Sequence, residues 1–226
     1  MTDPGRKETW SQSFIQLIKR HVVASVTPSG DAARTELDSH ADSPVVGKYA
    51  RIIWRTEKKV NVSGFTDELG DCVNIPVVHA AISYDDPYTG ETSTLIVNNA
   101  LYFKNMEVNL IPPIMIRLTG ADVNECPKFL SRNPSERDHT IWFPCKKRLI
   151  HLSLIGITSY INTRLPIEAE IQDRDNHIHL TPNTPEWDPH DTTYASQEDA
   201  MMSWDGHLKT MRETPYIFGV KQNVLD

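Results

Sequence analysis

The sequence is poor in cysteine and has no long hydrophobic run, and each scarcity excludes a class of protein. Its 226 residues include three widely spaced cysteines, Cys72, Cys126 and Cys145, with no Cys-x-x-Cys pair. This pattern provides neither a disulfide framework nor a zinc site, and it fits a reducing compartment. No apolar stretch approaches the length of a membrane span, and the N-terminus lacks the apolar segment of a signal peptide. We therefore expect an intracellular, cytoplasmic protein that does not bind a membrane.

Positive charge is also scarce. The chain has 23 Lys and Arg against 30 Asp and Glu, which gives a formal net charge of -7. Because phosphate recognition needs a basic face, we expect no direct nucleic-acid binding, and the short cluster at 146–148 is typical of a solvated loop. His177 and His179 would share one face of a strand. No third ligand lies at a suitable spacing, so a solvent-facing pair is favoured, with no metal and no cofactor.

The rest of the chain predicts a loop-rich protein built mainly of strands. Residues 9–26 carry apolar side chains at helical spacing and predict one amphipathic helix, which ends at the break 27–30. Strand-like runs follow, with two predicted hairpins between 35 and 120 and further strands beyond 120. The hairpins join 59–63 to 73–82 and 77–84 to 92–102, and the later strands are at 140–144, 149–160 and 177–180. The last part of the chain is polar and is expected to be partly helical or poorly ordered.

The most informative run is 36–47, which predicts a strand that delivers an aspartate into a tight polar turn. Asp38 follows Leu37, and the apolar pair Val45-Val46 resumes after the turn. At a two-fold axis, Asp38 would meet its symmetry mate. Two carboxylates about 3 Å apart share one proton and can act as general base and general acid together. The alternative at this point is that Asp38 only caps the turn, as aspartate often does.

Two separated motifs carry a family resemblance. The first is Leu37-Asp38-Ser39-His40-Ala41-Asp42-Ser43-Pro44-Val45-Val46, and the second is Asn109-Leu110-Ile111 within the stretch 100–111. In order and approximate separation they resemble the active-site run and the downstream Asn-apolar-apolar segment of retropepsin-like aspartic proteases. The resemblance is to the protease region of copia-type retrotransposon polyproteins in particular, and it extends over about residues 35–198. The part beyond 120 is similar to a region that follows the protease in some retroelement-like sequences and has no assigned activity.

The resemblance implies a mainly β fold. A retropepsin-like closed β-sheet domain with a flap hairpin would occupy 35–120. An N-terminal helix and linker would occupy 1–34, and an additional β-containing C-terminal extension with a polar tail would occupy 121–226. It also implies an aspartic endopeptidase that cleaves a peptide or polyprotein substrate. Since the chain has one such aspartate run, the active enzyme would be a homodimer with its site on the two-fold axis.

Individual roles follow from the same resemblance. Asp38 would be the catalytic aspartate, and Ser39 would hold the dimer through its hydroxyl. The substrate would be lined by His40, Ala41 and Asp42 in the turn and by the candidate flap tip Gly64, Phe65 and Thr66.

Two residues depart from the family pattern. His40 stands where the family has glycine, and a protonated imidazole there would oppose the one-proton state of the aspartate pair. Pro112 stands where retroviral enzymes have glycine, and it removes a hydrogen-bond donor. The alternative function is therefore a catalytically inactive retroelement-derived remnant that acts as a dimerisation or peptide-binding module.

Overall fold

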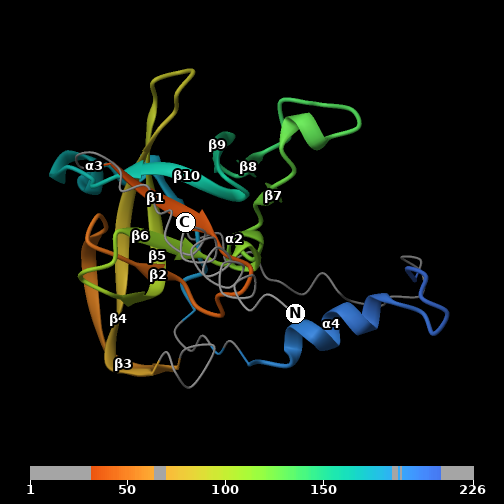
Figure 1. Cartoon of the computed structure of the whole chain (residues 1–226), viewed down its shortest axis with the longest axis horizontal. Coiled ribbons are helices and arrows are strands. Elements are labelled where there is room, and N and C mark those ends of the chain that lie inside the picture. Colours follow the sequence, from red (N-terminus) through yellow and green to blue (C-terminus); the bar gives the residue numbers. More distant parts are fainter. Residues whose placement is uncertain (1–31, 64–69, 185–187, 189, 210–226) are drawn as a thin grey trace, which may run out of the picture. The chain divides into compact units, whose positions relative to one another are not determined.

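The computed structural model describes residues 32–63, 70–184, 188 and 190–209 (Figure 1). The chain divides into one unit that reaches Thr184 and another that begins at Pro185, and each is described by itself. The first unit is mainly β, as the sequence predicts, and contains one mixed sheet of 11 strands with a few short helices. The helix predicted at 9–26 lies outside the described residues.

The sheet partly closes into a ring. Around the ring the strands follow in the order β4 (Asp71–Asp85), β5 (Thr92–Tyr102), β2 (Val45–Val46), β6 (Val108–Ile111), β1 (Ala32–Leu37) and β10 (Thr158–Arg164). The ring closes where Arg164 of β10 pairs with Ser83 of β4. The remaining strands extend the sheet: β3 (Arg51–Ser63) beside β4, β11 (His177–His179) beside β5, and β9 (Arg148–Ile155), β8 (Thr140–Phe143) and β7 (Asp122–Asn124) in turn beyond β10.

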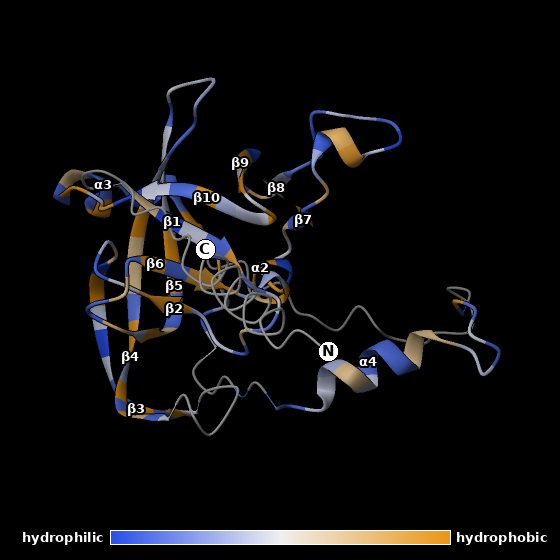
Figure 2. Cartoon of the chain, viewed as in Figure 1, coloured by the Kyte–Doolittle hydropathy of each residue, from blue (hydrophilic) through white to orange (hydrophobic). Residues whose placement is uncertain are grey.

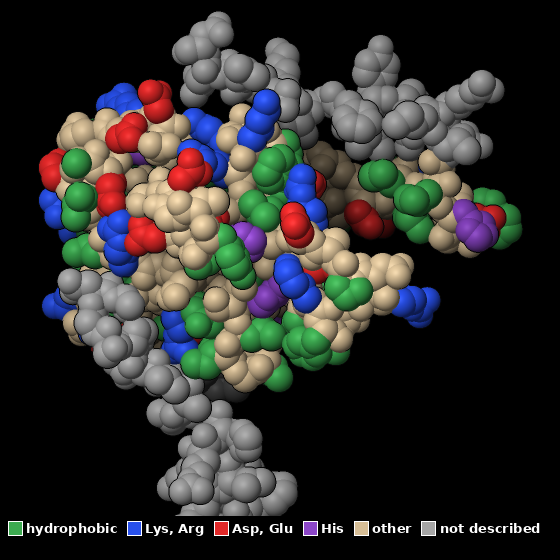
Figure 3. Space-filling view, turned by 90° about the horizontal axis from the view of Figure 1, so that it is seen from above, with side chains coloured by type: hydrophobic (Ala, Val, Ile, Leu, Met, Phe, Trp, Pro, Cys, Tyr) green, Lys and Arg blue, Asp and Glu red, His purple; other side chains and the backbone are tan. Residues whose placement is uncertain are grey.

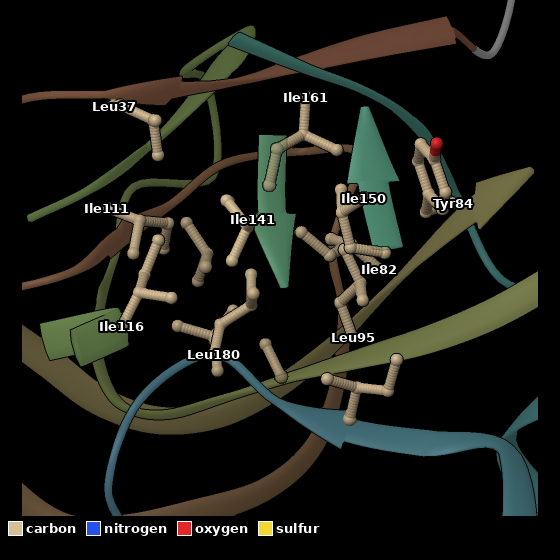
Figure 4. Packing of buried hydrophobic residues seen from close by; sticks show 14 of the residues in the cluster. Leu37, Ile82, Tyr84, Leu95, Ile111, Ile116, Ile141, Ile150, Ile161 and Leu180 are labelled. Atoms are coloured by element: carbon tan, nitrogen blue, oxygen red, sulfur yellow. The ribbon is translucent and has the colours of Figure 1, made fainter. Parts of the chain in front are cut away.

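The core fills the inside of this ring. It is made mainly of aliphatic side chains from strands and segments that are distant in the sequence (Figure 4), among them Ile82, Leu95, Ile111, Ile141, Ile150, Ile161 and Leu180. Hydrophobic residues recur along β4 and β5 (Figure 2), and these two strands supply much of the buried surface. Burying one such side chain contributes about 1.5–3 kcal/mol, so the shared core explains why strands from the whole length of the unit stay together.

The predicted hairpins are present. β3 and β4 pair antiparallel out to Ser63 and Asp71, and the predicted turn at 64–69 lies outside the described residues. β4 and β5 pair antiparallel out to Asp85 and Thr92, as the turn chemistry of 85–90 predicts. The run 149–160, in contrast, is not one strand: it forms β9 and β10, which turn at Gly156 with a φ of +59°. A positive φ is accessible to glycine without a steric penalty, and this permits the tight turn.

The region beyond residue 120 joins the same sheet as the region before it. β10 pairs antiparallel with β1, and β11 pairs parallel with β5. The predicted domain boundary between 35–120 and 121–226 stays a prediction, and both sides of it supply strands to one ring.

Short helices follow or cover the strands. Pro112 ends β6, and α2 (Pro113–Arg117) begins directly after it because proline is accepted in a first helical turn. Two 3-10 turns, η3 (Lys128–Leu130) and η4 (Arg174–Asn176), lie in the loops that follow. α3 (Glu168–Gln172) is tied to the sheet through Glu170, which binds Arg164 and accepts a hydrogen bond from the Ser83 hydroxyl at 2.8 Å.

In the second unit, α4 (Thr193–Met201) is the helix among residues 188 and 190–209, in agreement with the expectation of a partly helical end. None of the helices in the described part of the chain has both the length and the apolar character to span a membrane.

Candidate functional site

The two sequence motifs lie side by side in the sheet. β6 lies between β1 and β2, parallel to the first and antiparallel to the second. The loop 38–44 connects β1 to β2 and therefore passes over the end of β6. At this point the Asp38 N–H donates to the Ile111 carbonyl at 3.2 Å. Asp38 is thus anchored through its main chain to the segment that the second motif provides.

Asn109 links the strands on both sides of it. Its side chain is 1 % exposed; its Oδ1 accepts from the Gly47 N–H at 2.9 Å and its Nδ2 donates to the Thr35 hydroxyl at 3.0 Å. The Thr35 hydroxyl lies 3.0 Å from that of Thr163, which donates to the Ala33 carbonyl at 3.3 Å. Buried polar groups stabilise a structure when they are fully paired. This chain of bonds fixes β2, β6, β1 and β10 relative to one another around the Asp38 loop.

Gly47 is needed where β2 ends. A Cβ atom at this position would lie 2.1 Å from the Met106 carbonyl oxygen, which also accepts from the Lys48 N–H at 2.9 Å. Only glycine permits so close an approach of two main chains. Gly47, Thr35 and Thr163 were not recognised as site residues in the sequence. The signal for Thr35 is that Ala33 and Leu37, two positions away on either side, are apolar and share its face of the strand.

The carboxylate of Asp38 is directed by its own turn. Its Oδ1 accepts from the His40 N–H at 2.9 Å, and the side chain is 34 % exposed. The imidazole of His40 is 77 % exposed, and its Nδ1 lies 4.0 Å from the same oxygen. The main-chain N–H that a glycine would offer at position 40 is therefore present with histidine. His40 is not among the described residues with a positive φ, so the turn accommodates the imidazole.

The remaining predicted residues divide into two groups. Ser39 and Asp42 are exposed and Ala41 is half-buried, all within the same turn as Asp38. The turn ends at buried Pro44, whose carbonyl accepts from the Leu101 N–H at 2.8 Å. The candidate flap residues Gly64, Phe65 and Thr66 lie outside the described residues, so their role stays a prediction.

Other polar side chains pair without forming a metal site. His179 Nδ1 lies 3.0 Å from Asn98 Nδ2, and Asn98 Oδ1 lies 2.9 Å from His79 Nδ1. Partial burial of the ring, followed by the nearby charges of His177, Lys146 and His79, lowers the pKa of His179. Across the described ranges, no three His, Cys, Asp or Glu side chains gather closely enough to hold a metal ion.

We compared the chain with protein-family models, curated proteins and solved structures, and none of them matches it. The candidate site therefore rests on its own residues and geometry.

Proposed function

We propose that the protein is an aspartic endopeptidase of retrotransposon origin, active as a homodimer, in which two Asp38 side chains meet on a two-fold axis. One observation carries the proposal: the two motifs that resemble such proteases, separated in the sequence, are bonded to each other at Asp38 and Ile111. This bond joins main-chain atoms and continues the pairing of β1 with β6, so it places the Asp38 loop against the second motif.

The chemistry follows from two carboxylates that share a proton. The ionised Asp38 takes a proton from a water molecule between the two subunits, and the water oxygen attacks a peptide carbonyl. The protonated Asp38 gives its proton to the carbonyl oxygen, which yields a tetrahedral diol. The first Asp38 then passes the proton it took from water to the amide nitrogen, the C–N bond breaks, and the second Asp38 recovers a proton from a diol hydroxyl as the carboxylic acid product forms. Ser39 bonds across the axis to the partner subunit, while Ala41 and Asp42 line the substrate main chain. The half-exposed state of Asp38 supports this proposal, because the carboxylate is open to water and to a second subunit.

A second candidate is an inactive remnant that dimerises or binds peptides. The observation in its favour is the imidazole of His40 at 4.0 Å from the Asp38 carboxylate. When protonated, this ring would stabilise the ionised form of both carboxylates and would oppose the single shared proton.

Cleavage of a peptide library by the full chain tests the proposal. The matched variants are Asp38→Asn, which removes the acid and base, and Asp122→Asn, which changes an exposed aspartate on β7. We expect cleavage by the wild type and by Asp122→Asn, inhibition by a statine-type inhibitor, and a loss of at least about 1,000-fold in Asp38→Asn. Cleavage that persists unchanged in Asp38→Asn would disprove the assignment.

The variant His40→Gly separates the two candidates. If the wild type forms a dimer but does not cleave, and His40→Gly does cleave, the protein is a remnant silenced at this position. If both cleave, we expect their pH–rate profiles to differ, because only one of them carries an imidazole beside the carboxylates.

A further inference from the structure

A cleft lies in the first unit, away from the Asp38 loop. It has a volume of about 840 Å³ and is enclosed by the β4–β5 turn, the segment 127–139 and the β8–β9 hairpin. No residue of the 38–44 loop lines it. Figure 3 looks onto this side of the molecule, where histidine side chains lie among hydrophobic and basic ones. The volume is in the range of small-molecule sites, about 300–1,000 Å³.

The walls of the cleft are aromatic. Tyr88 on one rim is 79 % exposed and Phe129 on the other is 77 % exposed. The ring of Tyr88 packs edge-on against that of His151, with 4.6 Å between centroids. Trp142 lies in the wall, and the Arg137 guanidinium stacks on its ring at 3.9 Å. Exposed aromatic side chains that line one cleft form a candidate binding surface, and ring stacking favours a flat apolar group.

A buried hydroxyl provides an unused donor at the cleft. Tyr84 is 2 % exposed and accepts from the His151 N–H at 3.0 Å, but its own proton has no acceptor in the part of the chain that the structure describes. The hydroxyl points away from the neighbouring aliphatic side chains (Figure 4). Burial raises the pKa of Tyr84 to about 12, so it remains a neutral O–H donor at pH 7. A hydroxyl that accepts one hydrogen bond and lines a cleft can donate its proton to a ligand oxygen.

The charged side chains of the cleft also favour a ligand that accepts hydrogen bonds, because two of the acidic ones, Glu91 and Asp86, already have partners. Glu91 is paired with Arg148, and the Asp86 carboxylate accepts from the N–H groups of Tyr88 and Thr89. Lys147, by contrast, lines the cleft without an ion pair or side-chain hydrogen bond to any described residue.

Lys128 and Glu136 are the remaining charged side chains of the cleft lining. Lys128 is held by the Asp138 carbonyl and meets no carboxylate within the described ranges. Glu136, exposed in the lining, is the carboxylate for which the described residues provide no cation. The unused groups are therefore mainly donors and cations.

We propose that this cleft binds a planar aromatic carboxylate, with its ring against Tyr88 and Phe129 and its carboxylate toward the Tyr84 hydroxyl and Lys147. Two sources supply this chemistry: a free aromatic acid, or the C-terminal aromatic residue of a polypeptide. The proposal does not depend on the activity of Asp38.

Titration of the full chain with indole-3-propionate, measured by calorimetry and by ligand-observed NMR, tests the proposal. The comparison compounds are indole-3-propionamide, which lacks the charge, and cyclohexanepropionate, which lacks the flat ring. We expect saturable binding of indole-3-propionate with a Kd near or below about 1 mM, and binding at least about 5-fold weaker for both comparison compounds. Equal binding of the amide, or no saturation by indole-3-propionate at about 10 mM, would overturn the proposal.

Three variants locate the bound ligand. Tyr84→Phe removes the donor and is expected to weaken binding about 5- to 10-fold, and Phe129→Ala, at an exposed position where folding is little affected, is expected to weaken it similarly. Tyr102→Phe removes a hydroxyl from β5 outside the cleft and is expected to leave binding unchanged. Unchanged affinity in Phe129→Ala overturns the assignment even if Tyr84→Phe fails to fold.

A peptide ending in tryptophan distinguishes the two sources. Tighter binding of the peptide acid than of indole-3-propionate, with loss in the C-terminal amide, supports the proposal with a polypeptide terminus as ligand. Tighter binding of the free acid supports it with a small molecule as ligand.

Discussion

Replacing Asn109 by alanine tests the polar links that hold the Asp38 loop. The amide of Asn109 is buried, and it is the acceptor for the Gly47 N–H as well as a donor to Thr35. Asn109→Ala leaves the Gly47 N–H buried without a partner, removes the bond to Thr35 and opens a small cavity. These losses act in the same direction, so the variant should be clearly destabilised.

The size of the effect follows from the separate losses. An unsatisfied buried N–H costs about 1–3 kcal/mol, and a lost side-chain hydrogen bond costs about 1 kcal/mol. Together they predict a fall of about 3 kcal/mol in the free energy of unfolding. In a protein of this size, that corresponds to a fall of roughly 6–12 °C in Tm.

Urea denaturation followed by tryptophan fluorescence measures this change. Asn162→Ala is the matched control, because Asn162 lies exposed on β10, and it should change the stability by less than about 0.5 kcal/mol. Thr35→Val combined with Asn109→Ala should destabilise less than the sum of the two single variants, since both remove the same bond. If Asn109→Ala costs no more than Asn162→Ala, the polar links do not hold the loop and the reasoning is refuted.

Two further predictions concern the fold around the site and its response to pH. Gly47→Ala should destabilise by more than about 3 kcal/mol or prevent folding, because its Cβ would meet the Met106 carbonyl at 2.1 Å. Gly156→Ala is the control, because its Cβ meets nothing within 4 Å and only the positive φ should cost about 1–2 kcal/mol of stability. Thermal melts compare the two variants, and equal losses of stability in both would contradict this account. Because the pKa of His179 is lowered in the folded state, the stability from its neutral ring is present above about pH 6.5 and is lost as the pH falls below that value. His179→Asn keeps an acceptor for Asn98 and should lose less stability on acidification than the wild type; an unchanged pH dependence would count against the assignment.

Local features of the fold could be predicted from the sequence because their signals are local. The β4–β5 hairpin is specified by the turn at 85–90 between two apolar runs, and the polar turn after Leu37 is specified by its own residues. The separation of 149–160 into β9 and β10 depends on the positive φ of Gly156. A glycine can adopt a positive φ but need not do so, and the sequence therefore does not predict the turn.

The neighbours of each strand were much less predictable. The insertion of β6 between β1 and β2, and the pairing of β10 with β1, join residues far apart in the chain. Such pairings are selected by packing inside the closed ring, and no short sequence motif predicts that packing. For the same reason the sequence indicated Asp38 and Asn109 as two motifs but did not reveal that Thr35 and Gly47 connect them.

A subunit-mixing experiment tests the central claim most directly. Wild type and Asp38→Asn are refolded together at a constant total concentration, and peptide cleavage is measured against the fraction of wild type. If each site needs one Asp38 from each subunit, an equal mixture retains about one quarter of the wild-type rate, because only wild-type homodimers are active. The same mixture made with Asp122→Asn should retain the full rate. A rate of about one half in the Asp38→Asn mixture would mean that each subunit acts alone, and it would contradict a shared site on the two-fold axis.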